Sequence, residues 1–461
     1  MKLSIPQGTR DFSPEVVRRR QFICSTIQKI FEQYGFQPIE TPAMENLSTL
    51  MGKYGEEGDR LIFKILNNGI HDPKNTEKSK AAFENILTGK SDARLTERAL
   101  RYDLTIPFAR YVVMHQHEIA FPFRRYQMQP VWRADRPQRG RYREFWQCDA
   151  DIIGSTSLIN EAELISIYQA VFQALGIDGI QVKINNRKLL AGLATCCQAE
   201  DRFTDITVAI DKLDKIGWEG VEKELQQRGL QAGQITFIRQ YLDLQGAGHE
   251  ELLDNMQSLL ASSELAQKGI EELREVLAIH HLLAEQNDYG NSIVVIDPTL
   301  ARGLNYYTGF IAEVTTQAVA MGSLGGGGRY DDLTGLFGLK HLSGVGISFG
   351  IDRIYDVMEE LHLFPEALQS GTRILFVNIE PKAQTVLLRY VMMLRKAGIA
   401  AEYYADGGKF DKQMKYADKR HIPYVGIVGE RELQEGSIQL KNMESGMQEK
   451  ISPDMLLEKM K

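Results

Sequence analysis

The chain has 461 residues, a formal net charge of −7, 43% hydrophobic residues and 25% charged residues. This length exceeds what one hydrophobic core usually serves, so two or three domains are expected, and the acidic balance excludes a uniformly basic nucleic-acid-binding surface. Any contact with nucleic acid must therefore use local basic patches.

The cysteine pattern and the lack of long apolar segments predict the cellular compartment of the protein. Cys24, Cys148, Cys196 and Cys197 have neither zinc-site spacing nor a disulfide pattern, so a reducing cytoplasm is the expected location. Residues 1–10 lack an apolar segment, and no stretch reaches the roughly 18 apolar residues of a membrane span. Neither a leader nor a membrane contact is expected.

The first predicted element is a helix that begins at Ser13-Pro14-Glu15 and ends at Gly35, because apolar residues recur at helical spacing between them. Residues 36–42 predict an extended segment, since a residue before proline avoids the helical region. Residues 67–92 are polar and rich in Asn, Lys and Ser, which predicts a mobile surface loop. A second helix is predicted over residues 158–175, packed on a sheet.

Asp103 and Thr105 alternate with apolar neighbours, which predicts that both point from one face of a strand. An acid and a hydroxyl at this spacing could bind an ammonium group. The alternative is a salt-bridged aspartate at the end of a surface strand.

Residues 130–151 predict a hairpin with a cationic tip. Two strand-like stretches flank a loop that holds four arginines, Arg136, Arg139, Arg141 and Arg143. Arginines at this density, interleaved with aromatic residues, suit phosphate contacts and base stacking, although basic loops are usually only solvated. Gln147, Asp149 and Asp151 form a polar row on the returning strand, which indicates a site.

A cation and two adjacent phenols lie between the predicted strands 292–296 and 310–314. These residues are Arg302, Tyr306 and Tyr307. Arginine can hold a phosphate or a developing negative charge in fixed geometry, and tyrosine offers an apolar face with a hydroxyl. The alternative is a structural arginine in a turn beside core tyrosines.

Four consecutive glycines at 325–328 allow another backbone or a ligand to come close. The Gly-Lys-Ser/Thr of a phosphate loop is missing. Residues 343–350 predict a strand, and Arg353 falls where a helix begins, a position suited to a polyphosphate.

Two regions outside these motifs differ in pattern. Residues 187–288 carry helical segments rich in Glu, Gln and Leu, such as 252–283, with hardly any strand signal, which predicts an inserted helical domain. The carboxy-terminal part alternates strands and helices, which predicts a small α/β domain with a largely parallel sheet. The predicted elements are strands at 374–379, 401–404 and 424–428 and helices at 383–396 and 409–420.

Together, these motifs resemble the class II aminoacyl-tRNA synthetases, and within them the histidyl-tRNA synthetase family, over nearly the whole chain. The resemblance rests on the helix and strand ending near Pro42, the hairpin with Arg133, the strand leading to Arg353, and residues 300–307 and 325–330. It implies an α/β (α+β) fold whose catalytic core, residues 1–187 and 289–362, is built on an antiparallel sheet. The implied remainder is a helical insertion at 188–288, a linker at 363–371 and a mainly parallel α/β anticodon-binding domain at 372–461.

The resemblance also implies roles for single residues. For ATP it implies that Arg133 holds the α-phosphate, that Phe145 stacks on adenine and that Arg353 holds the far side of the nucleotide. Asp135 stands where the class usually has a glutamate. For histidine it implies Asp103, Thr105 and Gln147 at the α-ammonium, Asp151 and Tyr307 at the imidazole nitrogens, Tyr306 alongside, and Arg302 as catalytic partner of Arg133. For the tRNA acceptor end it implies Arg136, Gln138, Arg139 and Arg141. Tyr102, Asp103 and residues 147–151 resemble the eukaryotic branch of the family.

The implied activity uses ATP, with Mg²⁺ on the nucleotide, to convert L-histidine to histidyl-adenylate with release of pyrophosphate, and transfers the histidyl group to the 3′ end of tRNA(His). A homodimer is expected, and no protein ligand to the metal is assigned. The alternative is a histidine-sensing paralogue like the regulatory subunit of ATP phosphoribosyltransferase. Such chains usually lose the catalytic arginines and the carboxy-terminal module, whereas this chain keeps Arg133, Arg302, Arg353 and its tail.

Overall fold

The computed structural model describes residues 3–286, 293–301, 306–368 and 370–460, and it divides into two compact units. The larger unit comprises Met1–Asp11 and Arg20–Leu363 and holds the motifs of the resemblance except the start of the first helix and the carboxy-terminal domain. The smaller comprises Phe12–Arg19 and Phe364–Lys461. In the described part of the chain, no helix combines the length and the apolar character needed to cross a bilayer.

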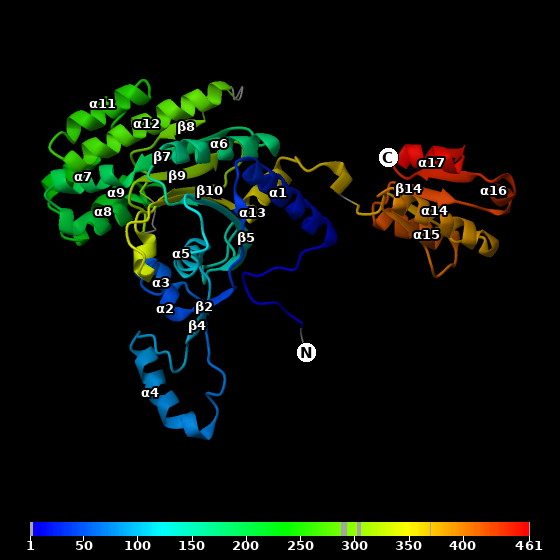
Figure 1. The fold of residues 1–461 in the computed structure, drawn as a ribbon, viewed down its shortest axis with the longest axis horizontal. Helices are drawn as coiled ribbons and strands as arrows, with labels where there is room; N and C mark the ends of the chain where they lie inside the picture. The colour runs from blue at the N-terminus through cyan, green and yellow to red at the C-terminus, as the bar shows by residue number, and fades with distance from the viewer. Residues whose placement is uncertain (1–2, 287–292, 302–305, 369, 461) are drawn as a thin grey trace. The chain divides into compact units, whose positions relative to one another are not determined.

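An eight-stranded sheet forms the centre of the larger unit, in the order β1-β5-β6-β11-β10-β9-β7-β8 (Figure 1). In that order the strands are Gln37–Pro38, Phe123–Trp132, Glu144–Ile153, Gly344–Gly350, Gly325–Arg329, Phe310–Thr316, Ile180–Asn186 and Val294–Ile296. Every pair from β5 to β7 is antiparallel, and only the edge strands β1 and β8 run parallel to their neighbours. The predicted antiparallel core is confirmed, as is the hairpin of β5 and β6.

Three helices, α1 (Pro14–Gln33), α6 (Ile159–Ala174) and α13 (Ile351–Glu360), accompany this sheet. Aromatic rings join two of them to β11: the ring of Phe349 lies 4.8 Å from that of Tyr168 in α6 and 5.8 Å from that of Phe31 in α1. Because α1 and α6 each bury an apolar face in such contacts, the sequence shows apolar residues at helical spacing in both. Of the extended segment predicted over 36–42, only β1 is a strand.

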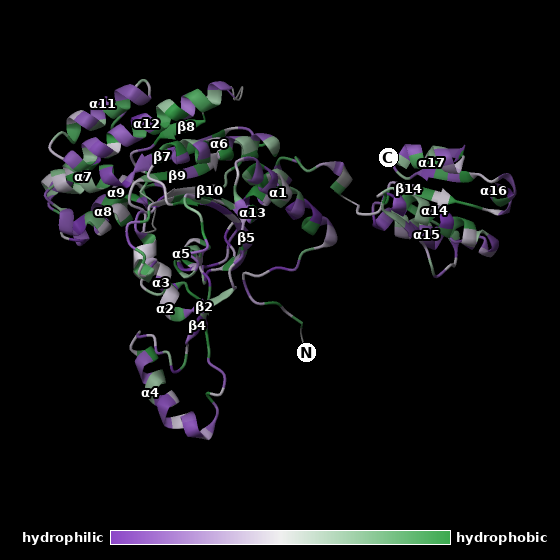
Figure 2. Ribbon diagram, viewed as in Figure 1, coloured by the Kyte–Doolittle hydropathy of each residue, from purple (hydrophilic) through white to green (hydrophobic). Residues whose placement is uncertain are grey.

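A smaller sheet, ordered β2-β4-β3, lies beside the first with a helical excursion attached. Its elements are β2 (Met44–Asn46), α2 (Leu47–Leu50), α3 (Gly55–Arg60), β3 (Lys64–Ile65), η1 (Pro73–Asn75), α4 (Thr76–Leu87) and β4 (Arg98–Leu100). The loop predicted over 67–92 is therefore wrong, because α4 occupies much of it. That helix buries only Ala82 and is mostly hydrophilic (Figure 2), so its polar composition pointed to a loop although the segment is helical.

Asp103 and Thr105 do not lie on a strand, which corrects the sequence prediction. β4 ends at Leu100, and Thr105 is the first residue of α5 (Thr105–Met114). The Oδ1 atom of Asp103 accepts a hydrogen bond from the backbone N–H of Ile106 at 3.1 Å. The aspartate thus satisfies one of the free N–H groups of the first helical turn, which is a capping contact rather than strand alternation.

Helices fill the region between β7 and β8. They are α7 (Arg187–Cys196), η2 (Glu200–Arg202), α8 (Phe203–Ile210), α9 (Leu213–Gln227), α10 (Ala232–Leu242), α11 (His249–Leu259) and α12 (Glu264–Gln286). α12 packs on α6 and α7, so within the larger unit these helices adjoin the central sheet. The helical character agrees with the sequence; the boundaries of a separate insertion stay a prediction. Past β10, η3 (Leu333–Phe337) precedes β11.

The smaller unit contains a five-stranded sheet ordered β13-β12-β14-β15-β16. Its elements are η4 (Glu366–Leu368), β12 (Ile374–Phe376), η5 (Pro381–Ala383), α14 (Gln384–Lys396), β13 (Ala401–Tyr403), α15 (Phe410–Lys419), β14 (Tyr424–Ile427), α16 (Glu430–Glu435), β15 (Ile438–Asn442), β16 (Gln448–Ile451) and α17 (Pro453–Met460). β12, β13 and β14 are parallel, as predicted, whereas β15 and β16 add antiparallel pairs that the sequence reading missed.

Candidate active site

A cavity of about 260 Å³ opens over β6, β10 and β11 in the larger unit. Eleven of the residues to which the resemblance assigns a role line it: Asp103, Thr105, Arg133, Asp135, Arg141, Phe145, Gln147, Asp151, Tyr306, Tyr307 and Arg353. They come from the start of α5, from the β5–β6 hairpin, from the segment before β9 and from α13. Motifs far apart in the sequence thus meet at one place, as the predicted site requires.

The glycine-rich strand β10 forms the floor of this cavity. A Cβ atom on Gly327 would lie 2.0 Å from the carbonyl oxygen of Gly346, and one on Gly346 would lie 1.9 Å from Oδ1 of Asp151. A Cβ on Gly328 would meet the ring of Tyr307 at 2.8 Å. Because no larger residue fits at these points, the expected close approach of another backbone is confirmed.

Cationic groups mark one end of the cavity. The guanidinium carbon of Arg133 lies 4.3 Å from the ring centroid of Tyr102 and 5.2 Å from that of Phe145, and its Nε donates to the carbonyl of Tyr102 at 3.1 Å. Arg353, near the start of α13, donates to the carbonyls of Gly140 at 2.7 Å and Ser323 at 2.5 Å. Fixed guanidinium groups beside an exposed ring face suit a nucleotide with its phosphates.

Asp103 is buried and receives hydrogen bonds on both oxygens. Besides the Ile106 N–H, the hydroxyl of Tyr54 donates to Oδ1 at 2.9 Å and that of Tyr306 donates to Oδ2 at 3.4 Å. Burial raises the pKa of the Asp103 carboxyl, and the Ile106 N–H, the charge of Arg133 and the two phenols oppose that shift. The carboxylate therefore orders the start of α5 and two phenols of the wall.

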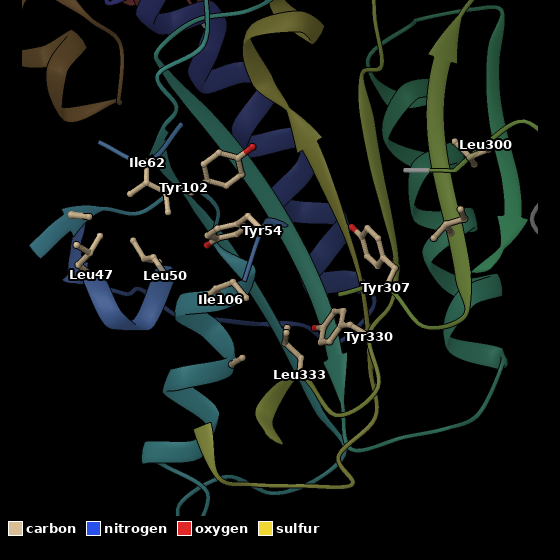
Figure 3. Close-up of a cluster of buried hydrophobic side chains, with 13 residues drawn as sticks. Leu47, Leu50, Tyr54, Ile62, Tyr102, Ile106, Leu300, Tyr307, Tyr330 and Leu333 are labelled. Atoms are coloured by element: carbon tan, nitrogen blue, oxygen red, sulfur yellow. The ribbon is translucent and has the colours of Figure 1, made fainter. Parts of the chain in front are cut away.

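Asp151 is held by two partners that the sequence reading did not identify. The Nη2 atom of Arg125 lies 2.7 Å from its Oδ2, and the Tyr330 hydroxyl donates to its Oδ1 at 2.6 Å. Burial raises the pKa of Asp151, whereas Arg125 and Tyr330 lower it. Figure 3 shows Tyr307 and Tyr330 within a cluster of buried side chains, and both also line the cavity, so these phenols belong to the core and to the site.

Asp149 also lines the cavity, although it was predicted only as a member of the polar row. It is only 2% exposed, and burial raises its pKa to about 7, with Arg125 lowering it and Asp151 raising it further. Ser348, directly across on β11, hydrogen-bonds to this carboxyl and accepts a hydrogen bond from Nε2 of Gln147 at 2.8 Å. The alternation of polar side chains along β6 is the sequence pattern that indicated Asp149 as part of a site.

Five predicted residues need separate mention. Arg302 lies outside the described residues. Arg136, Gln138 and Arg139 are exposed in the hairpin loop and do not line the cavity, and Arg139 pairs with Glu360. Arg141 lies at its rim, with Nη1 3.7 Å from Oδ1 of Asp135. A solvated cationic loop beside the cavity is the arrangement that the hairpin prediction described.

Tyr54, Arg125, Tyr330 and Ser348 were missed as site residues. Tyr54 and Arg125 meet the site only through other side chains, whereas Tyr330 and Ser348 line the cavity themselves, and no local sequence pattern distinguishes the four from core or strand residues. Tyr330 follows the glycine run and so could have been found from its position. Among the described residues, no group of three or more His, Cys, Asp or Glu side chains is arranged to hold a metal ion.

Comparison with known proteins agrees with this geometry. A family model described as histidyl-tRNA synthetase matches residues 80–354, and one described as an anticodon binding domain matches residues 373–461. The histidine–tRNA ligase of Christiangramia forsetii is 54% identical over 98% of this chain and 97% of its own length, and that of Flavobacterium johnsoniae is 51% identical over 98% and 97%. The crystal structure of histidyl-tRNA synthetase from Nostoc sp. PCC 7120 matches with a TM-score of 0.80 and 30% identity, covering 100% of this chain and 99% of that one.

Proposed function

Because this chain belongs to the histidyl-tRNA synthetase family, we propose that it is a histidine–tRNA ligase, which activates L-histidine with ATP and transfers it to the 3′ end of tRNA(His). The observation that supports this most is that one cavity is lined both by the guanidinium groups of Arg133 and Arg353 and by the carboxyl groups of Asp149 and Asp151. The guanidinium groups suit a nucleotide with its phosphates, and the carboxyl groups suit an amino acid with its ammonium group.

Charge controls the first step. The histidine carboxylate attacks the α-phosphorus of ATP, a new C–O–P link forms, and the bond to pyrophosphate breaks with its electron pair. Arg133 would hold the α-phosphate, and the resemblance assigns Arg302 to its other side; two cations lower the repulsion between attacker and phosphate. No general base is needed, because the carboxylate is already ionised at neutral pH.

Mg²⁺ would accompany the nucleotide. With no cluster of three ligating side chains among the described residues, the metal would be coordinated mainly by phosphate oxygens and water, which is the usual manner for Mg²⁺. Its chemistry is to neutralise charge on the β- and γ-phosphates.

Histidine would be recognised by both of its polar ends. The resemblance assigns Asp103, Thr105 and Gln147 to the α-ammonium, and Asp151 and Tyr307 with Tyr306 to the imidazole. A ligand lacking a ring nitrogen would leave a buried polar group unpaired, which can discriminate by roughly 10⁴. No editing domain is then required.

In the second step the terminal ribose hydroxyl of the tRNA attacks the carbonyl carbon of the adenylate, and AMP leaves. The exposed loop with Arg136, Gln138, Arg139 and Arg141 is the proposed contact for the acceptor end. The helices of residues 188–288 are proposed to hold the acceptor arm, and residues 372–461 to bind the anticodon. A homodimer in the cytoplasm is the proposed form.

Histidine-dependent exchange of labelled pyrophosphate into ATP tests the proposal. Folded protein that exchanges with histidine, but not with other amino acids, supports the ligase. The competing function is a histidine sensor without catalysis, which would bind histidine and give no exchange. Charging of tRNA(His) then tests the transfer step.

A further inference from the structure

An amino-terminal segment, residues 6–10, lies against the cationic loop of the β5–β6 hairpin, and we call this segment the strap. It forms a turn, in which the N–H of Thr9 donates to the carbonyl of Pro6 at 3.2 Å. The loop, residues 136–143, carries the arginines that are proposed to contact the acceptor end of tRNA. The strap and the loop are far apart in sequence, so their contact is a feature of the tertiary structure.

Backbone contacts join the strap to the returning side of the loop. The N–H of Arg143 donates to the carbonyl of Gly8 at 2.9 Å, and the Nη1 atom of Arg143 donates to the carbonyl of Gln7 at 3.3 Å. Gly8 has a φ of 84°, and a Cβ atom on it would lie 2.7 Å from Cγ of Arg143 and 2.9 Å from Cγ of Pro137. Glycine is therefore needed here, and the strap packs closely on both ends of the loop.

Arg10 extends this contact from the loop to α13. Its guanidinium carbon lies 3.3 Å from the ring centroid of Tyr142, and its Nη2 forms an ion pair with Asp352. The Tyr142 hydroxyl donates to Oδ2 of Asp356, also in α13, at 3.2 Å. One arginine thus covers the aromatic ring of the loop and binds the helix that carries Arg353.

Asp352 has other partners besides Arg10. Its Oδ1 also pairs with Nη1 of Arg20 in α1 at 2.5 Å, and its Oδ2 accepts a hydrogen bond from the N–H of Trp146 at 3.1 Å. Removal of the Arg10 guanidinium would leave this buried carboxylate paired. The consequence of that change would therefore fall on Tyr142 and the loop.

The composition of the loop explains why it needs support. Arg136, Gln138 and Arg139 are exposed, so these side chains bury little surface that could hold the backbone in one conformation. A loop that is ordered before RNA arrives loses less conformational entropy on binding, which raises the affinity. Contacts with the strap on one side and with α13 on the other supply this order.

We propose that the strap holds the loop in the form that receives the acceptor end of tRNA, and that Arg10 is a positioning residue for the transfer step. The inference rests on the proposed function and concerns residues to which the resemblance assigns no role. It also separates the two half-reactions, because adenylate formation uses the side chains inside the cavity and does not require RNA in the loop.

Arg10→Met tests the positioning role, because methionine keeps an unbranched apolar stem and lacks the guanidinium. The variant should raise KM for tRNA(His) on the order of tenfold in charging and change histidine-dependent pyrophosphate exchange by less than about twofold. Arg20→Met is the matched control, since it removes the other guanidinium from Asp352 and leaves the strap intact. Its KM for tRNA should stay within about twofold of wild type. Equal rises in the two variants would overturn the inference, because they would indicate an effect through Asp352.

Gly8→Ala displaces the strap without removing a charge, because the added methyl group would meet the Arg143 side chain. It should reproduce the rise in KM for tRNA and leave pyrophosphate exchange nearly unchanged. A rise for Arg10→Met without a rise for Gly8→Ala would overturn the strap in favour of a direct contact between Arg10 and RNA. An unchanged KM in both variants would overturn it as well.

Trypsin gives a readout that needs neither RNA nor catalysis. Arg10→Met and Gly8→Ala should each raise the initial rate of cleavage after Arg139 on the order of fivefold, whereas Arg20→Met should cleave like wild type. Equal cleavage rates in all four proteins would overturn the hold of the strap on the loop, whatever the activity. Protein that showed the cleavage difference but never charged tRNA(His) would instead overturn the proposed function, and with it the role in transfer.

Discussion

Arg125 and Asp151 lie directly opposite each other on β5 and β6 and form a buried ion pair, with 2.7 Å between Nη2 and Oδ2. The exposed fractions of the two side chains are 0% and 3%. A second acid, Asp149, lies beside the pair, so one guanidinium serves two carboxyl groups. Stability and ligand binding are therefore coupled at this point of the sheet.

Replacing Arg125 with methionine should strongly destabilise the protein, because the change leaves Asp151 buried without its cation. Loss of one partner of a buried pair costs roughly 3–5 kcal/mol in the free energy of unfolding. Urea denaturation at pH 7.5 measures it. Glu77→Gln, which breaks the exposed Glu77–Lys80 pair, should cost less than about 0.5 kcal/mol. Similar effects of the two substitutions would contradict the assigned importance of the buried pair.

Arg302→Ala should lower the rate of adenylate formation by on the order of 10² or more while weakening ATP binding little, because the proposed task of this side chain is to stabilise charge in the transition state. Single-turnover kinetics with saturating ATP and histidine measure the rate, and calorimetry measures the affinity. Arg136→Ala, in the exposed hairpin loop, should leave adenylation nearly unchanged and weaken only the transfer to tRNA. A rate loss of only a few-fold for Arg302→Ala would argue against its role.

Gly327→Ala should destabilise the protein by roughly 1–3 kcal/mol or prevent folding, because the added methyl group would lie 2.0 Å from a backbone carbonyl oxygen that cannot rotate away. Gly233→Ala in α10, where no heavy atom lies within 4 Å of the added methyl group, should be neutral or stabilising by up to about 1 kcal/mol. Thermal unfolding of the two variants gives the comparison, and equal melting temperatures would refute the steric argument.

The buried acid makes stability depend on pH. The pKa of Asp149 in the free folded protein is raised to about 7, mainly by burial, so the folded state holds this proton more tightly than the unfolded chain does. Its contribution to stability is complete below the unfolded pKa of about 4 and is lost as the pH rises through about 7. From pH 5 to pH 8, wild-type protein should lose about 2–4 kcal/mol relative to Asp149→Asn in denaturant titrations. Parallel pH curves would mean that Asp149 does not titrate in this range.

Removal of residues 371–461 should spare pyrophosphate exchange and impair charging of tRNA, because the cavity lies wholly in the larger unit and the anticodon is the proposed ligand of the smaller. Exchange and charging rates are measured on the same preparation. A shortened chain that charged tRNA(His) as fast as the full chain would refute the anticodon assignment.

The sequence predicted the elements that bury a continuous apolar face. α1, α6 and the β5–β6 hairpin have such faces, and the hairpin also displays its polar row. α4 and β16 do not: the helix buries only Ala82, and Gln448, Glu449 and Lys450 are all exposed, so neither element has a continuous buried face. Asp103 was misplaced for another reason, since a capping residue and an alternating strand residue look alike over three positions.

The residue types in the sequence predicted most of the side chains that line the candidate site, but they did not predict the contacts among those side chains. Gln147, Asp149 and Asp151 could be grouped because alternation along one strand is local. That Asp151 faces Arg125 depends on the pairing register of two strands, and that Tyr330 reaches it depends on a third segment of the chain. Register and tertiary approach are set by the whole sheet, so the missed residues are those whose place in the site depends on a partner on another segment of the chain.

Four of the five residues of β10 are glycines, two of which line the cavity, and this composition has a thermodynamic consequence for ligand binding. Glycine has no side-chain rotamers that a bound substrate could restrict. Binding against these glycines therefore loses less conformational entropy than binding against flexible side chains. More of the interaction with the substrate's polar ends then remains as net affinity.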